Sequence, residues 1–144
     1  MKVVFRVDAS AEVGFGHLSR CINLAEVLRS RGIEVLFICR DDEAKIFNFL
    51  EKRLLKALPL PSNTASLKIS QETEDEETID ALDGVRHSWL IVDGFKLDGK
   101  FEEKLRRYVK KLLLLKTWPI VNMTTICSLT IIKNIATRAN HASD

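Results

Sequence analysis

The fold is decided by residues 8–20, which read Asp-Ala-Ser-Ala-Glu-Val-Gly-Phe-Gly-His-Leu-Ser-Arg. A short run rich in β-branched residues precedes this stretch, and an amphipathic helical pattern follows it. Gly14 and Gly16 allow the backbone to turn tightly and to approach a ligand without hindrance from a Cβ atom. His17 and Arg20 come at the start of the helix, where the N–H groups and the dipole favour an anionic guest. The stretch therefore predicts a strand, a glycine-containing loop and a helix that begins at a candidate site.

The residues on either side extend this stretch into a βαβ unit. Val3-Val4-Phe5 together with Val7 is typical of a short, buried, β-branched strand, and residues 33–39 are interpreted as a second buried strand. The helix between them is expected to end before Gly32. It should bury one face, formed by Leu18, Cys21, Ile22, Ala25 and Leu28. A crossover of this kind predicts that the two strands pair in parallel.

The same alternation continues to residue 115. We expect helices over residues 42–52, 72–82 and 101–109, and strands over residues 54–58, 88–94 and 112–115. Pro59 should close the 54–58 strand, and Tyr108 should point inward from the last helix. The seven acids between residues 72 and 83 are interpreted as a solvated helix face, in preference to a metal site. This order predicts an α/β fold, a Rossmann-like open, mostly parallel sheet with helices on both faces.

The composition narrows the class of protein. The 144 residues suit one domain or one half of a two-lobed protein, and a net charge of +2 does not point to a nucleic-acid or membrane partner. The cysteines at positions 21, 39 and 127 lack metal-ligand spacing and are interpreted as reduced thiols of a cytoplasmic protein. The apolar run after Met1 is too short for a signal peptide, and no run reaches membrane-spanning length. We expect no metal and no cofactor.

Two loops should face one crevice, because ligands of open α/β sheets bind beyond the carboxyl ends of the strands. One loop is residues 8–17, and the other is Asp93-Gly94-Phe95. Position 19 is Ser, so the third glycine of a dinucleotide-binding fingerprint is absent and an NAD site is not favoured. At a helix N-terminus the dipole favours neutral imidazole, which can take a proton from water. His17 is therefore a candidate base that Asp8 could orient, the alternative being a structural capping role.

Three stretches resemble a specific family. They are Arg6-Val7-Asp8-Ala9-Ser10, then Val13-Gly14-Phe15-Gly16-His17-Leu18-Ser19-Arg20-Cys21, and later Leu90-Ile91-Val92-Asp93-Gly94-Phe95. The chain is similar here to the UDP-2,4-diacetamido-2,4,6-trideoxy-β-L-altropyranose hydrolases (PseG) of pseudaminic acid biosynthesis. The likeness covers residues 2 to about 115, and the first forty residues are its most specific part.

The resemblance implies a glycosyltransferase-B-like enzyme of two Rossmann-type lobes. Water would displace UDP from the sugar with inversion, without a metal, and His17 would match the catalytic histidine. Gly14 and Gly16 would lie on the loop that approaches the sugar and diphosphate. Substrate-binding positions would be Asp8, Gly14, Gly16, Arg20, Asp93 and Phe95. Many members of the family have Tyr where this chain has Phe95, which removes a hydroxyl that could reach the substrate.

Residues 116–144 depart from the pattern. Not one Asp or Glu occurs from Lys104 to Ser143. The family has a sequence like Asp-Asp-Leu-Ala-x-Arg-x-His-x-Cys-Asp-Leu-Leu after the strand matched by residues 112–115. When residues 116–128 are back-translated and read in a shifted frame, the possible codons can encode this family sequence at almost every position. The Cys of the family sequence is the exception. We therefore expect a frameshift near residue 116: residues 1–115 form the N-terminal lobe, residues 116–144 an out-of-frame tail, and the nucleotide-binding C-terminal lobe is absent.

Three functional interpretations remain after this reasoning. The first is a UDP-sugar hydrolase in a truncated form that is inactive alone, because half of the cleft is missing. The second is a sugar- or nucleotide-binding module that acts with a separate partner. The third is a glycosyltransferase with a true acceptor, which shares the fold.

Overall fold

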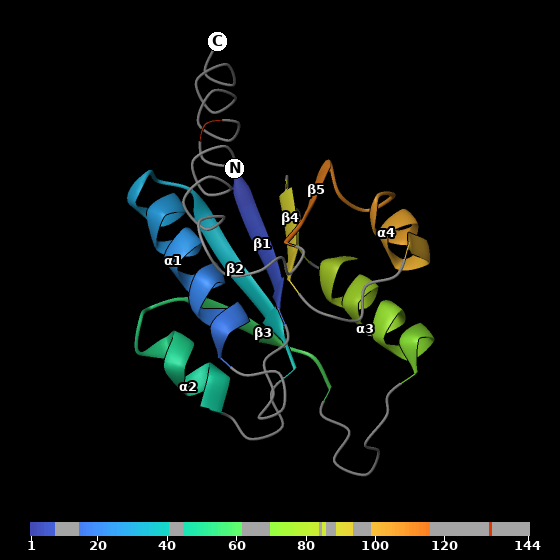
Figure 1. Ribbon diagram of the computed structural model, residues 1–144, viewed down its shortest axis with the longest axis horizontal. Coiled ribbons are helices and arrows are strands. Elements are labelled where there is room, and N and C mark those ends of the chain that lie inside the picture. Colours follow the sequence, from blue (N-terminus) through green and yellow to red (C-terminus); the bar gives the residue numbers. More distant parts are fainter. Residues whose placement is uncertain are drawn as a thin grey trace.

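The computed structural model describes residues 1–7, 15–40, 45–61, 70–83, 85, 89–93, 99–115 and 133. The elements follow the order β1 (Lys2–Val7), α1 (Gly16–Ser30), β2 (Glu34–Cys39), α2 (Lys45–Glu51), β3 (Lys56–Pro59), α3 (Gln71–Asp83), β4 (Trp89–Asp93), α4 (Gly99–Leu105) and β5 (Lys111–Leu114). The strands form one sheet in the order β3-β2-β1-β4-β5 (Figure 1). Every strand pair in it is parallel.

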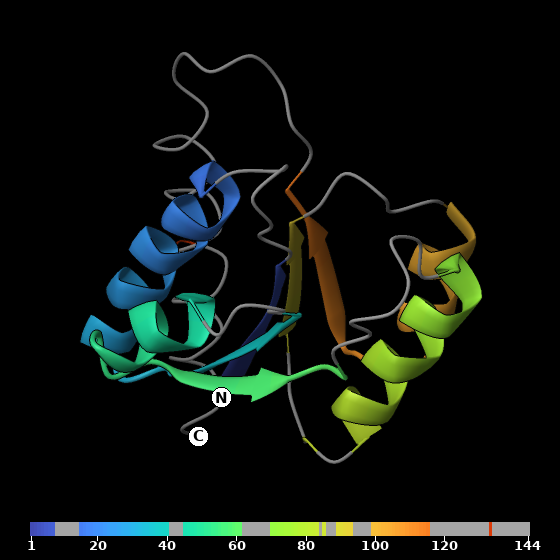
Figure 2. The same ribbon diagram turned by 90° about the horizontal axis from the view of Figure 1, so that it is seen from below.

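The predicted fold class is confirmed. β1 lies at the centre of the sheet, and the chain adds strands first on one side of it and then on the other. Figure 2 shows α1 and α2 on one face of the sheet and α3 and α4 on the opposite face. This strand order is that of a doubly wound Rossmann-like sheet, in which the order reverses next to the first strand.

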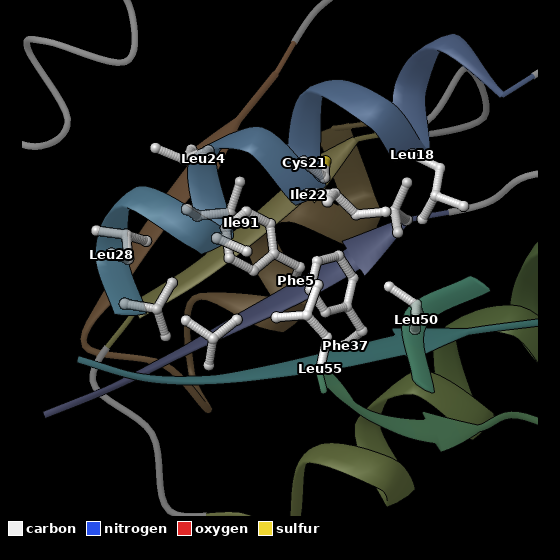
Figure 3. Packing of buried hydrophobic residues seen from close by; sticks show 14 of the residues in the cluster. Phe5, Leu18, Cys21, Ile22, Leu24, Leu28, Phe37, Leu50, Leu55 and Ile91 are labelled. Carbon is white, nitrogen blue, oxygen red and sulfur yellow. The ribbon is translucent and has the colours of Figure 1, made fainter. Parts of the chain in front are cut away.

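The face beneath α1 and α2 is packed with apolar side chains (Figure 3). Phe5 on β1 and Phe37 on β2 are fully buried, and their rings stack with centroids 5.0 Å apart. The apolar face predicted for α1 is buried: Leu18, Cys21, Ile22, Ala25 and Leu28 all belong to this core. The helix ends as predicted at Gly32, whose φ is 76°. The Gly32 and Ile33 N–H groups donate to the Arg29 and Leu28 carbonyls, which closes a Schellman motif.

The face beneath α3 and α4 combines a smaller apolar cluster with ion pairs. Arg6, buried on β1, donates to Glu74 Oε1 at 2.8 Å and to Thr78 Oγ1 at 3.2 Å, both on α3. Arg40 pairs with Glu77 in the same way at the end of β2. The interpretation of the acidic run as a solvated face is therefore wrong for these positions, because basic residues of the sheet lie opposite them.

Smaller differences from the predicted elements have local causes. Leu54 lies outside β3 and is 82% exposed. Its φ is 56°, because it follows the end of α2 in a second Schellman motif. In this motif the Leu54 N–H donates to the Glu51 carbonyl and the Leu55 N–H donates to the Leu50 carbonyl. Pro59 pairs within β3 instead of following it, which an edge strand tolerates. Helix α4 ends at Leu105, and Tyr108 is 48% exposed instead of pointing inward. The expectations for the tail, apart from Lys133, fall outside the described residues.

Candidate functional site

The candidate site lies at the carboxyl edge of the sheet. β1 and β4 are neighbours, and Val7 at the end of one pairs in register with Asp93 at the end of the other. Side chains alternate along a strand, so Asp93 shares the face of Ile91, which belongs to the core beneath α1. Helix α1 begins at Gly16 above the same edge. The first turns of α1 and the end of β4 are thereby brought together.

The Asp93 carboxylate is the centre of the site. It is 1% exposed, and three side chains from α1 contact its oxygens. His17 Nδ1 lies 2.6 Å from Oδ1. The Arg20 guanidinium donates through Nη2 to Oδ1 and through Nε to Oδ2, a side-on pair. The Cys21 Sγ lies 3.4 Å from Oδ2, so that the thiol donates to the same carboxylate.

The spacing of the α1 residues explains why they converge. Positions 17, 20 and 21 are related as i, i+3 and i+4, which places three side chains on one stripe of a helix. This stripe continues the apolar face that packs on the sheet, where Leu18, Ile22 and Ala25 are buried. Packing of α1 on this face of the sheet therefore carries His17, Arg20 and Cys21 to Asp93.

The electrostatics of the cluster balance. A buried carboxylate requires a counter-charge and hydrogen bonds, and Arg20 supplies both to Asp93. Burial and then the negative charge of Asp93 raise the pKa of the Cys21 thiol well above its ordinary value. Cys21 therefore remains a thiol, which can donate a hydrogen bond, and is not a nucleophilic thiolate. With a neutral His17 ring the four side chains carry no net charge.

The contact between His17 and Asp93 selects one tautomer of the imidazole. An ionised carboxylate only accepts hydrogen bonds, so an Nδ1–Oδ1 distance of 2.6 Å requires a proton on Nδ1. Arg20 Nη2 also lies 2.9 Å from Nδ1, but a protonated Nδ1 cannot accept from it. In the neutral ring Nε2 then carries the lone pair. A buried carboxylate that accepts from Nδ1 can hold a histidine so that Nε2 is able to accept a proton.

The start of α1 suits an anionic group. Phe15 occupies the N-cap position without a side-chain hydrogen bond to the helix, and the first turn contains no acid. The positive end of the helix dipole is thus not offset by acidic side chains of its first turn. A Cβ atom on Gly16 would meet no described atom within 4 Å, and the only positive φ among the described glycines belongs to Gly32. The backbone conformation of Gly16 therefore does not itself require glycine, contrary to the tight turn expected there.

The residues predicted for the site divide into two groups. His17, Arg20 and Asp93 are brought into contact, and Gly16 lies one residue before His17. Asp8, Gly14 and Phe95 fall outside the described residues. The sequence reasoning missed Cys21 as a polar contact and assigned Asp93 to substrate, whereas its carboxylate faces α1. The spacing of His17, Arg20 and Cys21 on one helix stripe was the available signal.

The described part of the chain shows neither a metal-binding cluster nor a membrane-spanning helix. No group of three or more His, Cys, Asp or Glu side chains there is placed to hold a metal ion. None of the helices in that part is both long enough and apolar enough to cross a membrane.

Sequence comparison identifies a distant relative but no matching family model. No protein-family model matches the chain. "Uncharacterized protein MJ1062" of Methanocaldococcus jannaschii is 25% identical over 114 residues, which cover 78% of this chain and 21% of the relative. The chain therefore spans about a fifth of that protein.

Comparison of structures identifies the fold. A glycosyltransferase from Rickettsia africae matches with a TM-score of 0.59 and 14% identity, over 84% of this chain and 31% of that one. Acinetobacter baumannii MurG matches with a TM-score of 0.60 and 13% identity, over 90% of this chain and 39% of that one. The fold is that of a glycosyltransferase-B lobe. The chain spans roughly a third of each of these proteins.

Proposed function

We propose that residues 1–115 are the N-terminal lobe of a UDP-sugar hydrolase and that His17 is its general base. The observation that carries this proposal is the 2.6 Å contact between His17 Nδ1 and the buried Asp93 carboxylate at the carboxyl edge of a parallel sheet. Ligands of such sheets bind at this edge. The resemblance of residues 6–21 and 90–95 supports a UDP-2,4-diacetamido-2,4,6-trideoxy sugar of pseudaminic acid biosynthesis as the substrate.

The geometry suits hydrolysis by direct displacement. His17 Nε2 accepts a proton from water while the water oxygen bonds to the anomeric carbon. The bond from that carbon to the UDP oxygen breaks, its electron pair leaves with UDP, and the configuration at the carbon inverts. Asp93 accepts the hydrogen bond from Nδ1 throughout and stabilises the imidazolium that forms. The uncapped start of α1 favours the negative charge of the substrate.

The fold supports a second candidate, a glycosyltransferase. The same base would then deprotonate an acceptor hydroxyl in place of water, and the product would be a glycoside. The identity of the product separates the two reactions: free sugar appears in the first and a glycoside of an added acceptor in the second. A binding module that acts with a separate nucleotide-binding subunit is distinguished by calorimetry with UDP, UDP-sugar and free sugar.

The activity test requires both lobes. We propose that the second lobe is encoded in the shifted frame after residue 115, and sequencing of the gene tests this directly: absence of such a frame would refute it. Residues 1–144 alone are expected to release negligible UDP. The two-lobed protein should release UDP, and His17→Gln should lower the rate by about 10²–10⁴-fold. Asn23→Ala, on the exposed face of α1, is the matched control and should not change it. An equal rate in His17→Gln would contradict the proposed base.

A further inference from the structure

The Asp93 carboxylate is held from two sides. Arg20 approaches it with a side chain that is 26% exposed, so this donor comes from the solvent side. Cys21 approaches Oδ2 from the core, where its side chain is fully buried and packs among apolar residues (Figure 3). Both donors belong to α1, as does His17. Oδ2 therefore receives Arg20 Nε and Cys21 Sγ, while Oδ1 receives His17 Nδ1 and Arg20 Nη2.

Arg20 alone leaves the tautomer of His17 open to competition. Its Nη2 lies 2.9 Å from His17 Nδ1 as well as against Oδ1. A small rotation of Asp93 away from His17 would let Nη2 donate to Nδ1, and the ring proton would then move to Nε2. That tautomer has no lone pair on Nε2 and cannot accept a proton there. The thiol opposes this rotation, because Cys21 has a single χ angle and is fixed by core packing.

We infer that Arg20 and Cys21 are positioning residues that together clamp Asp93 and so keep the His17 proton on Nδ1. The inference rests on the proposed function for its catalytic meaning, but the clamp itself is a property of this lobe. It assigns to Arg20 a task at Asp93 in place of direct contact with substrate, and to the Cys21 thiol a task beyond filling the core. Arg20 and Cys21 thus each donate a hydrogen bond to the Asp93 carboxylate, from opposite sides.

The ¹⁵N chemical shifts of the His17 ring test this clamp in the 144-residue chain, since they report which nitrogen carries the proton. The chain has three histidines, and a His17→Gln spectrum identifies the signals of His17. Cys21→Ser retains a donor and should keep the wild-type tautomer ratio. Cys21→Ala loses the donor and should shift the ratio toward Nε2–H by about two- to fivefold. Arg20→Lys keeps the charge but loses the side-on fork, and should shift it by about tenfold.

A second pair of variants controls for the change in side-chain volume at position 21. Cys21→Thr and Cys21→Val have the same shape and differ in the hydroxyl, so the ratio should follow the donor and not the volume. If the Ala variant does not fold, this pair decides the question. Wild-type ratios in both Arg20→Lys and the variants without a donor would overturn the inference.

Kinetics of the two-lobed protein separate this inference from the proposed function. Arg20→Lys should lower kcat with little change in KM if Arg20 positions the base, and should raise KM if it binds substrate. A shifted tautomer ratio in a protein that releases no UDP would uphold the clamp and refute the hydrolase. Normal hydrolysis with an unshifted ratio would uphold the hydrolase and refute the clamp.

Discussion

The two faces of the sheet are held by different chemistry. Beneath α1 and α2 the described part of the chain has seventeen buried apolar residues in one cluster, centred on the Phe5–Phe37 stack. Beneath α3 and α4 it has eight, and α3 is fixed in addition by ion pairs with Arg6, Arg40 and Lys104. The candidate site lies at the edge of the first face. The more apolar face surrounds its polar cluster with buried apolar side chains, and in such surroundings hydrogen bonds to a carboxylate are stronger than in water.

Loss of an aromatic ring should have the largest effect on stability. Phe37→Ala removes one partner of the stack and leaves a cavity in the apolar core, which should lower the free energy of unfolding by about 3–5 kcal/mol. Urea denaturation followed by circular dichroism measures this value. Phe37→Leu, which retains most of the apolar volume, should lose clearly less. Equal losses in the two variants would show that this face is not held by packing.

On the face with ion pairs, removal of one charge should lower the free energy of unfolding. Removal of its partner as well should restore part of that loss. Arg6→Met leaves Glu74 without a buried counter-charge from β1 and should cost about 3 kcal/mol. Arg6→Met combined with Glu74→Met should recover at least half of that loss, because no unbalanced charge remains in the pair. The same urea experiment measures both. Additive losses in the double variant would mean that the pair does not act as a unit.

Gly16 offers a variant that separates stability from activity. Gly16 is the first residue of α1, and its φ is not positive. Gly16→Ala should therefore raise the free energy of unfolding by up to about 1 kcal/mol, since alanine has the higher helix propensity. The added methyl group lies at the start of α1, where we propose that the negative charge of the substrate binds, so UDP release by the two-lobed protein should fall. A destabilised Gly16→Ala chain would contradict the account of this helix start.

Of these positions, Lys104 should contribute least to the stability of the fold. Its pair with Asp75 raises the pKa of Lys104 above 10.5, chiefly through the hydrogen bond to that carboxylate, but the lysine is solvent-exposed. Because the folded-state pKa is raised, the contribution is present below pH 10.5 and is lost as the pH rises through the folded-state value. The small difference in Tm between wild type and Lys104→Met should therefore shrink above that pH. A difference that grows there would contradict this sign.

The sequence was sufficient for the fold and for part of the site. Apolar runs and glycine at position 32 predicted the strands and helices because packing and backbone conformation act locally. His17 was identified from its place at the start of a helix. Its contact with Asp93 joins residues 76 positions apart, and local patterns do not specify which carboxylate meets which ring. The pairing of Arg6 with Glu74 was missed for the same reason, since an acidic run looks solvated until the opposite strand is known.

We propose that Asp93 orients His17 as a base. The most direct test is the ¹⁵N spectrum of the His17 ring in wild type and in Asp93→Asn at neutral pH. We predict a proton on Nδ1 and a lone pair on Nε2 in wild type, because Asp93 accepts from Nδ1 at 2.6 Å. In Asp93→Asn an amide can donate to Nδ1, and the proton should move to Nε2. A wild-type ring protonated on Nε2, or a tautomer that the substitution leaves unchanged, would contradict the account.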